Sequence, residues 1–229
     1  MVAGDGHHVA PVALEDGLEQ QAQPVEHPEV DGESLSVLYL DAAAATRGWY
    51  RSGTLQASCH QPLETVSETL SIGRVHDCIG LAVRFAHQFG LSSPRIAVCG
   101  LNPHAGEDGL LGDEEQRIIQ PAIELAQSQW GVDSDTQITG PWPGDSIWKA
   151  ALAGKHDVVV AMFHDQGLIP AKLMAPEGAV NLTLGLPIIR TSPDHGTAFE
   201  IAGQGKADPS SMQKAIQLAL ELIPVGTPL

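Results

Sequence analysis

The sequence predicts an α/β protein with a three-layer α/β/α arrangement. Apolar runs of strand length alternate along the chain with longer segments of helical periodicity, an order typical of a sheet covered by helices on both faces. With 229 residues, 43% of them hydrophobic, the chain is long enough for one large domain or two small ones with a packed core. Neither an internal repeat nor a linker divides it, so we expect one α/β domain over residues 35–229.

The first part of the chain changes from irregular to periodic. Residues 1–34 are rich in Gly, Glu, Gln, Pro and His and predict an irregular N-terminal segment. Strands are expected over Leu35 to Leu40 and Thr54 to Ser58. Apolar residues at helical spacing predict a helix over 72–90, which the glycine at its end stops.

The middle of the chain continues the alternation. Arg95 to Gly100 predicts a short strand followed by a polar loop. Acidic residues 113–115 indicate the start of a helix, in which Pro121 must lie in the first turn or cause a kink. A short strand is expected over 136–139 and a short helix over 146–153.

The last third holds the clearest strand. Residues 157–163 contain consecutive β-branched residues without alternation, as in a buried parallel strand. Further strands are expected over 179–184 and 187–191. The sequence Asp208-Pro-Ser-Ser211 predicts the start of a helix with a serine cap.

Composition narrows the class of protein. The formal net charge of −16 argues against nucleic acid as a general partner, because phosphate binding requires clustered Lys and Arg. The three cysteines show no C-x-x-C pattern and predict reduced thiols in a cytoplasmic protein. No apolar run approaches the ~20 residues of a membrane span, and no signal peptide is expected.

Three histidines each follow a strand-like segment: His60, His104 and His164. Imidazole suits divalent transition metals, and three protein ligands with open positions are typical of a catalytic site. If the strands are neighbours, the three loops open on one edge of the sheet. The alternative for each residue is a loop histidine satisfied by hydrogen bonds.

Lys172, Asn181 and Arg190 lie nine residues apart among apolar or small residues. A cation in such a place is expected to meet an anion, because an unpaired buried charge is costly. A substrate phosphate or carboxylate would serve. The alternative is an ion pair with a local acid.

A polar turn with small residues follows at Asp194-His-Gly-Thr-Ala198. Such a turn can accept the adenine or ribose end of a dinucleotide. The G-x-G-x-x-G fingerprint of a Rossmann domain is absent, so the turn by itself does not define the type of nucleotide site.

Four ordered motifs together resemble the 4-hydroxythreonine-4-phosphate dehydrogenases of pyridoxal phosphate biosynthesis. They are Val98-Cys-Gly-Leu-Asn-Pro-His-Ala-Gly-Glu107, Met162-Phe-His-Asp-Gln-Gly-Leu168, Val180-Asn-Leu-Thr-Leu-Gly-Leu-Pro-Ile-Ile-Arg-Thr191 and the turn at 194–198. The resemblance runs from roughly Leu55 to the C-terminus. It implies the isocitrate/isopropylmalate dehydrogenase type of fold, a homodimer with a shared active site, NAD, and a divalent metal such as Zn, Mg or Co.

The resemblance also implies roles for individual residues. His60, His104 and His164 would bind the metal, with His60 in a Cys-His-Gln-Pro-Leu context that is similar to the family's Thr-His-Leu-Pro-Leu. Lys172, Asn181 and Arg190 would bind the substrate, Lys172 also serving as an acid/base or electrostatic group. The segment of His195, Gly196, Thr197 and Ala198 would bind NAD.

The reaction so implied is a metal-assisted oxidation of 4-phosphohydroxy-L-threonine to a β-keto acid that loses carbon dioxide. The family's opening Gly-Asp-Pro-Ala-Gly-Ile-Gly-Pro-Glu motif has no match here. We therefore expect an N-terminally truncated member with the central dimer-forming lobe and the C-terminal return. Two alternatives stay open: a sister dehydrogenase for another 3-hydroxy acid (a phosphorylated sugar acid or dihydrodiol carboxylate), and an inactive metal-binding dimeric homologue.

Overall fold

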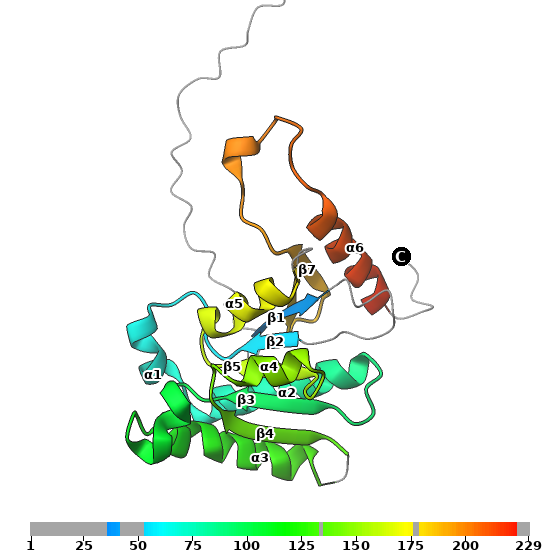
Figure 1. The fold of residues 1–229 in the computed structure, drawn as a ribbon. Coiled ribbons are helices and arrows are strands. Elements are labelled where there is room, and N and C mark those ends of the chain that lie inside the picture. The colour runs from blue at the N-terminus through cyan, green and yellow to red at the C-terminus, as the bar shows by residue number, and fades with distance from the viewer. Residues whose placement is uncertain (1–35, 42–52, 133–134, 176–178, 224–229) are drawn as a thin grey trace, which may run out of the picture.

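The computed structural model describes residues 36–41, 53–132, 135–175 and 179–223. The irregular segment expected at 1–34 lies outside these ranges. Seven strands form one sheet in the order β4-β3-β5-β2-β1-β6-β7 (Figure 1). The strands are β1 (Ser36–Asp41), β2 (Gly53–Gln56), β3 (Arg95–Cys99), β4 (Gln137–Trp142), β5 (Val158–Ala161), β6 (Ala179–Leu184) and β7 (Arg190–Pro193).

The sheet is parallel on one side and antiparallel on the other. Strands β4, β3, β5 and β2 run parallel to one another, whereas β1 is antiparallel to both β2 and β6, and β6 is antiparallel to β7. The carboxyl ends of the parallel strands therefore meet at one edge, which is where ligand sites form in open α/β sheets.

Helices cover both faces of the sheet, as the sequence predicts. The helical segments are η2 (Leu63–Thr65), α1 (Val66–Thr69), α2 (Ile72–Gln88), η3 (Pro103–Gly109), η4 (Glu115–Ile119), α3 (Gln120–Trp130), α4 (Ile147–Leu152), α5 (His164–Met174), η5 (Phe199–Ile201) and α6 (Ser210–Leu222). Helices α2, α3 and α6 share the main hydrophobic core on one face. Helices α4 and α5 each bury a smaller cluster on the other face. None of the helices in the described ranges has both the length and the apolar character needed to cross a membrane.

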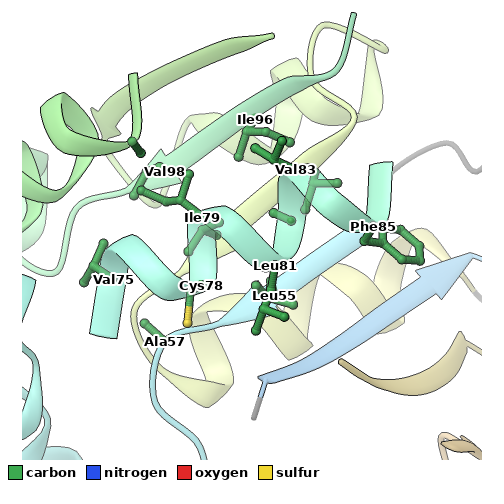
Figure 2. Packing of buried hydrophobic residues seen from close by; sticks show 14 of the residues in the cluster. Leu55, Ala57, Val75, Cys78, Ile79, Leu81, Val83, Phe85, Ile96 and Val98 are labelled. Carbon is green, nitrogen blue, oxygen red and sulfur yellow. The ribbon is translucent and has the colours of Figure 1, made fainter. Parts of the chain in front are cut away.

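Helix α2 forms the centre of the main core, which Figure 2 shows from close by. Ser71 caps the helix by accepting a hydrogen bond from the Arg74 N–H. Its buried face packs against β2, β3 and β5, with Ile79 fully buried among side chains that include Leu55 and Val98. Gly90 follows with φ +84°, a left-handed conformation that ends helices. The helix predicted over 72–90 is thus confirmed.

Asp157 fixes the register of three parallel strands at their amino ends. Its carboxylate accepts hydrogen bonds from the Arg95 N–H and guanidinium at 2.7–3.0 Å. Its own N–H donates to the Arg95 carbonyl, and its carbonyl accepts from the Gly53 N–H. The hydrogen bond to the carboxylate raises the pKa of the Arg95 guanidinium. The side chain and backbone of one residue thus join β3, β5 and β2.

The structure corrects three details of the sequence prediction. The strand expected over 187–191 begins later, at Arg190, since Pro187 lacks an N–H for pairing and Gly185 turns the chain with φ +86°. Helix α5 was not predicted, because its glycine and Pro170 obscure the helical pattern. The serine cap expected for α6 does not form: the N-cap residue is Pro209, without a side-chain capping bond, and Asp208 accepts from the Ser210 N–H at 2.9 Å in the turn before it.

Pro121 lies in the first turn of α3, one of the two places expected for it. The helix there follows a π-helical turn at 115–119. Because this turn is continuous with α3, the missing N–H of Pro121 removes one bond from the helical ladder.

Replacing Ile79 with alanine is expected to lower the free energy of unfolding by about 2–5 kcal/mol, because it opens a cavity in a fully buried position. The matched control is Ile216→Ala in α6, where the side chain is 54% exposed and the loss should be under about 1 kcal/mol. Urea unfolding followed by circular dichroism measures both. Equal losses in the two variants would contradict this description of the core.

Candidate functional site

The three predicted metal ligands all follow the carboxyl ends of adjacent parallel strands. His60 follows β2, His164 follows β5 and His104 follows β3, and these strands are neighbours in the order β3-β5-β2. The condition under which the three loops open on one edge, that their strands be neighbours, is met. The topology therefore brings the three loops to one edge of the sheet.

His60 and His164 form a pair at this edge. Their ring centroids are 5.2 Å apart and the rings are inclined by 44°. Two imidazoles on one tetrahedral zinc ion, with Zn–N of about 2.1 Å, have ring centres about 5 Å apart. The spacing of the pair thus fits a shared divalent ion. The pair borders a cavity of about 270 Å³ whose lining also includes Ser58, Cys59, Leu63 and Phe163.

Asp165 orients one ring of the pair. The His164 Nδ1 lies 2.7 Å from the Asp165 Oδ1, so Nε2 is the nitrogen left for a ligand. A carboxylate on the second ring nitrogen is the usual arrangement around metal-binding histidines. His60 has φ +49°, a left-handed conformation that is uncommon for a non-glycine residue and typical of functional sites.

His104 lies in the adjoining groove and not with the pair. This groove has a volume of about 730 Å³ and shares Leu63, Val66 and Phe163 with the first cavity. Among the residues that the structure describes, no three His, Cys, Asp or Glu side chains lie close enough to hold a metal ion. The described chain thus brings two of the three predicted ligands together and leaves the third beside them.

The loop that carries His104 has an unusual backbone. Residues 104–108 all have positive φ, between 44° and 81°. Left-handed conformation costs a non-glycine residue roughly 1–2 kcal/mol, so surrounding interactions must hold the loop in place.

Glu115 supplies those interactions. The residue is 3% exposed, and its carboxylate accepts hydrogen bonds at 2.7 Å from the N–H groups of Leu101 and Asn102. It also accepts from the Asn102 side-chain amide at 2.9 Å, and Glu114 accepts from the same amide at 2.7 Å. The buried carboxylate therefore anchors the start of the loop to the turn before α3.

Two glycines leave room for this carboxylate. A Cβ atom at Gly100 would lie 2.9 Å from Glu115 Oε1, and one at Gly106 would lie 2.7 Å from Glu115 Oε2. Both distances are shorter than a carbon–oxygen contact allows. The sequence motif around His104 is therefore glycine-rich because the backbone must approach a buried acid.

Gln166 joins the ends of two strands beneath the site. Its Oε1 accepts from the Met162 N–H at 2.6 Å, and its Nε2 donates to the Gly100 carbonyl at 2.8 Å. The sequence predicted only that Glu115 lies at a helix start, and it predicted no role for Gln166. The glycines at 100 and 106 were a sequence signal that the backbone approaches another group closely. Nothing in the sequence indicated the partners of Gln166.

Cys59 precedes His60 and contributes a neutral thiol to the cavity wall. Burial raises its pKa to about 11, and the thiol donates to Gln56 Oε1 at 2.9 Å. At neutral pH this side chain is a hydrogen-bond donor and not an anion.

The three predicted substrate residues lie on the α5 side of the sheet. Lys172 belongs to α5. On β6, Val180 and Leu182 enter the core on the opposite face, so Asn181 between them points to the α5 side. Arg190 on β7 donates to Thr183 at 2.7 Å and shares that side.

The local partners of the two cations differ. Lys172 Nζ lies 3.1 Å from the Asp194 carboxylate, which is the ion pair with a local acid that the sequence left open as an alternative. Arg190 contacts a threonine hydroxyl and is exposed to solvent.

The turn predicted to bind a nucleotide begins an extended segment. Figure 1 shows the chain after β7 running out from the sheet before it returns to α6. His195, Gly196 and Thr197 are exposed, and His195 Nδ1 lies 2.9 Å from the Gly196 carbonyl oxygen. Ala198 has φ +47° at the start of η5.

The imidazole pair and the substrate cations are separated along α5. His164 is the first residue of this helix and Lys172 lies eight residues further on. At 1.5 Å per residue this places their backbones about 12 Å apart. The two groups of predicted site residues therefore lie near opposite ends of one helix.

Comparison with known proteins gives a consistent result. A family model described as pyridoxal phosphate biosynthetic protein PdxA matches residues 53–219. A 4-hydroxythreonine-4-phosphate dehydrogenase of Desulfosudis oleivorans is 54% identical over 163 residues, which cover 71% of this chain and 47% of that protein. A D-threonate 4-phosphate dehydrogenase of Salmonella typhimurium is 51% identical over 168 residues, covering 73% of this chain and 50% of the relative.

Solved structures agree. The crystal structure of 4-hydroxythreonine-4-phosphate dehydrogenase from Klebsiella pneumoniae superposes with a TM-score of 0.70 at 42% identity, covering 83% of this chain and 54% of that one. A terephthalate 1,2-cis-dihydrodiol dehydrogenase from Burkholderia xenovorans has a TM-score of 0.62 at 29% identity, covering 82% and 55%. The chain spans about half the length of the curated relatives it matches.

Substitution of Glu115 by alanine should lower the free energy of unfolding by about 2–4 kcal/mol, because three donors lose their charged acceptor. Glu115→Gln keeps one acceptor oxygen and should lose less. The control, Glu124→Ala, removes an exposed acid from α3. Urea unfolding and amide hydrogen exchange of residues 101–109 measure the effects. If Glu115→Ala behaves like the control, the carboxylate does not anchor the loop.

Proposed function

This chain belongs to the PdxA family, and we propose that it acts as an NAD-dependent oxidoreductase on 4-phosphohydroxy-L-threonine with a divalent metal ion. The observation that carries the proposal is the family match over residues 53–219, which includes every predicted site residue from His60 to Ala198. Relatives named 4-hydroxythreonine-4-phosphate dehydrogenase are 54% and 59% identical to this chain.

His60 and His164, with His104, are the proposed metal ligands. Support comes from the 5.2 Å spacing of the His60 and His164 rings and from the carboxylate that orients His164. Imidazole ligands favour zinc or cobalt over magnesium. When bound, such an ion would lower the pKa of the substrate hydroxyl and stabilise negative charge on its oxygen.

The proposed substrate contacts are cationic in a strongly acidic chain. Lys172 and Arg190 would hold phosphate and carboxylate, with Asn181 donating a further hydrogen bond. Hydride would leave the carbinol carbon for NAD bound at residues 195–198. The resulting β-keto acid would lose carbon dioxide, and Lys172 is the proposed acid that returns a proton to the product.

Exposed apolar side chains on α5 (His164–Met174) support a site shared between two copies of the chain. Ile169 and Leu173 on the same helix are 58% and 76% exposed, a feature that a homodimer interface would bury. We therefore include a homodimer in the proposal.

A second candidate substrate is D-threonate 4-phosphate. The Salmonella typhimurium relative with this name is 51% identical to the chain, close to the values of the other group. Both substrates carry a phosphate, so the proposed cations serve either one. Because the chain is similar to a dihydrodiol dehydrogenase, a third class of substrate, which has no phosphate, is included in the activity assay.

The chain is expected to reduce NAD in the presence of a phosphorylated substrate and a divalent metal, followed as the absorbance of NADH. 4-Phosphohydroxy-L-threonine and D-threonate 4-phosphate are compared with a dihydrodiol carboxylate, and a chelator should abolish turnover. No turnover with any substrate, together with metal binding by calorimetry and no NAD binding, would favour an inactive metal-binding homologue.

His164→Ala should weaken zinc binding at least about tenfold, because even groups that only orient a metal ligand typically contribute that much. Metal-dependent NADH formation should be lost with it. His87→Ala removes an exposed histidine that bonds to the Leu91 carbonyl and serves as the control. Zinc affinity by calorimetry and NADH absorbance are the readouts. Full activity in His164→Ala would exclude this residue as a ligand.

A further inference from the structure

The Lys172–Asp194 pair connects two parts of the proposed site: the substrate-binding lysine and the start of the nucleotide turn at residues 195–198. Lys172 Nζ lies 3.1 Å from the Asp194 Oδ1 and 3.3 Å from the carbonyl oxygen of the same residue. The ammonium is thus held by two oxygens of one residue. Lys172 belongs to α5, whereas Asp194 directly follows β7 and begins the segment that leads into the proposed nucleotide turn.

The two partners differ in exposure. The Lys172 side chain is 52% exposed, whereas that of Asp194 is 12% exposed. An anion arriving from solvent can therefore reach the ammonium, while the carboxylate stays largely covered. The carboxylate competes for the same cation as any incoming phosphate or carboxylate.

Asp194 is also fixed from the opposite side. Its N–H donates to the Ser211 hydroxyl at 3.1 Å, and this hydroxyl donates to the Ala179 carbonyl at 3.2 Å. The start of the segment is therefore held between α5 and the first turn of α6. Beyond this point residues 195–197 are exposed, and the ion pair ties the start of the segment to α5.

We propose that Asp194 is a positioning residue that occupies the Lys172 anion site until a ligand anion displaces it, and that this displacement loosens the root of the turn at residues 195–198. The inference rests on the proposed function, in which Lys172 binds the substrate and the turn contacts NAD. Binding of an anion at Lys172 is thereby linked to the conformation of the cofactor turn, and the linkage is reciprocal.

The test uses inorganic phosphate as the anion and the Asp194→Asn variant, which removes the competing charge and keeps the shape and backbone carbonyl. Phosphate should bind Asp194→Asn about three- to tenfold more tightly than the parent chain, measured by calorimetry at constant ionic strength. Asp113→Asn is the matched control: it removes the same charge from an exposed pair with Arg117 and should leave phosphate affinity unchanged.

Amide hydrogen exchange of the peptide covering residues 194–209 reports on conformation, so a change in charge without a change in conformation would leave it unaltered. Phosphate should speed exchange in the parent chain and in Asp113→Asn. In Asp194→Asn, and in Lys172→Met, exchange should be fast already and insensitive to phosphate. Lys172→Met breaks the pair from the other side, so a folding defect in one variant does not remove the test.

Unchanged phosphate affinity in Asp194→Asn, or no phosphate effect on exchange in the parent chain, would overturn the inference. Absence of phosphate binding in both chains would overturn it as well. The proposed function fails separately, through the NADH assay. If the chain is inactive but shows both phosphate effects, the inference about Asp194 stands and the proposed function is wrong. If the chain is active but shows neither effect, the proposed function stands and the inference is wrong.

Discussion

The carboxylate of Asp157 fixes the relative positions of the three strands on which the candidate site is built. It bonds to the backbone and guanidinium of Arg95, while its own backbone bonds to Arg95 and Gly53. A slip of one residue between these strands would turn every side chain to the opposite face. The loops at the other ends of β2, β3 and β5 would then lose their alignment, so the histidine positions depend on an interaction at the far edge of the sheet.

At the site edge, the supporting residue Glu115 is buried and Gln166 is half-buried, whereas two of the candidate metal ligands are exposed. Glu115 and Gln166 hold the loop after β3 through hydrogen bonds to backbone groups, whereas His60 and His104 are exposed. A strained loop keeps its shape only if its surroundings determine it more strongly than its own preferences do. The buried carboxylate, with glycines packed against it, provides that constraint around His104.

Anion binding in this acidic chain also depends on individual residues. A chain with 28 acidic and 12 basic side chains attracts few anions in general, so an anion site needs cations at defined points. Lys172 is such a point, and an acid of the same chain already neutralises it. Because Asp194 lies at the start of the segment after β7, the neutralising contact is also a mechanical one between α5 and that segment.

The sequence by itself determined most of the order of strands and helices, including the buried β5 strand and helix α2, and the identity of the chemically distinctive residues. These follow from local periodicity and from motifs, which do not depend on distant contacts. Helix α5 escaped prediction because its Gly167 and Pro170 weaken the local pattern, and packing against β1, β2 and β5 forms it nonetheless. Likewise the start of β7 depends on pairing with β6.

Only the tertiary structure decided which site residues meet. It joined His60 with His164 across 104 residues of sequence, left His104 in the adjoining groove, and gave Lys172 the acid Asp194 as its partner. It also supplied the roles of Glu115 and Gln166, whose hydrogen-bond partners are mostly backbone groups, which any residue type provides. The physical reason is that sequence patterns report local conformation, whereas such contacts arise from strand order and register.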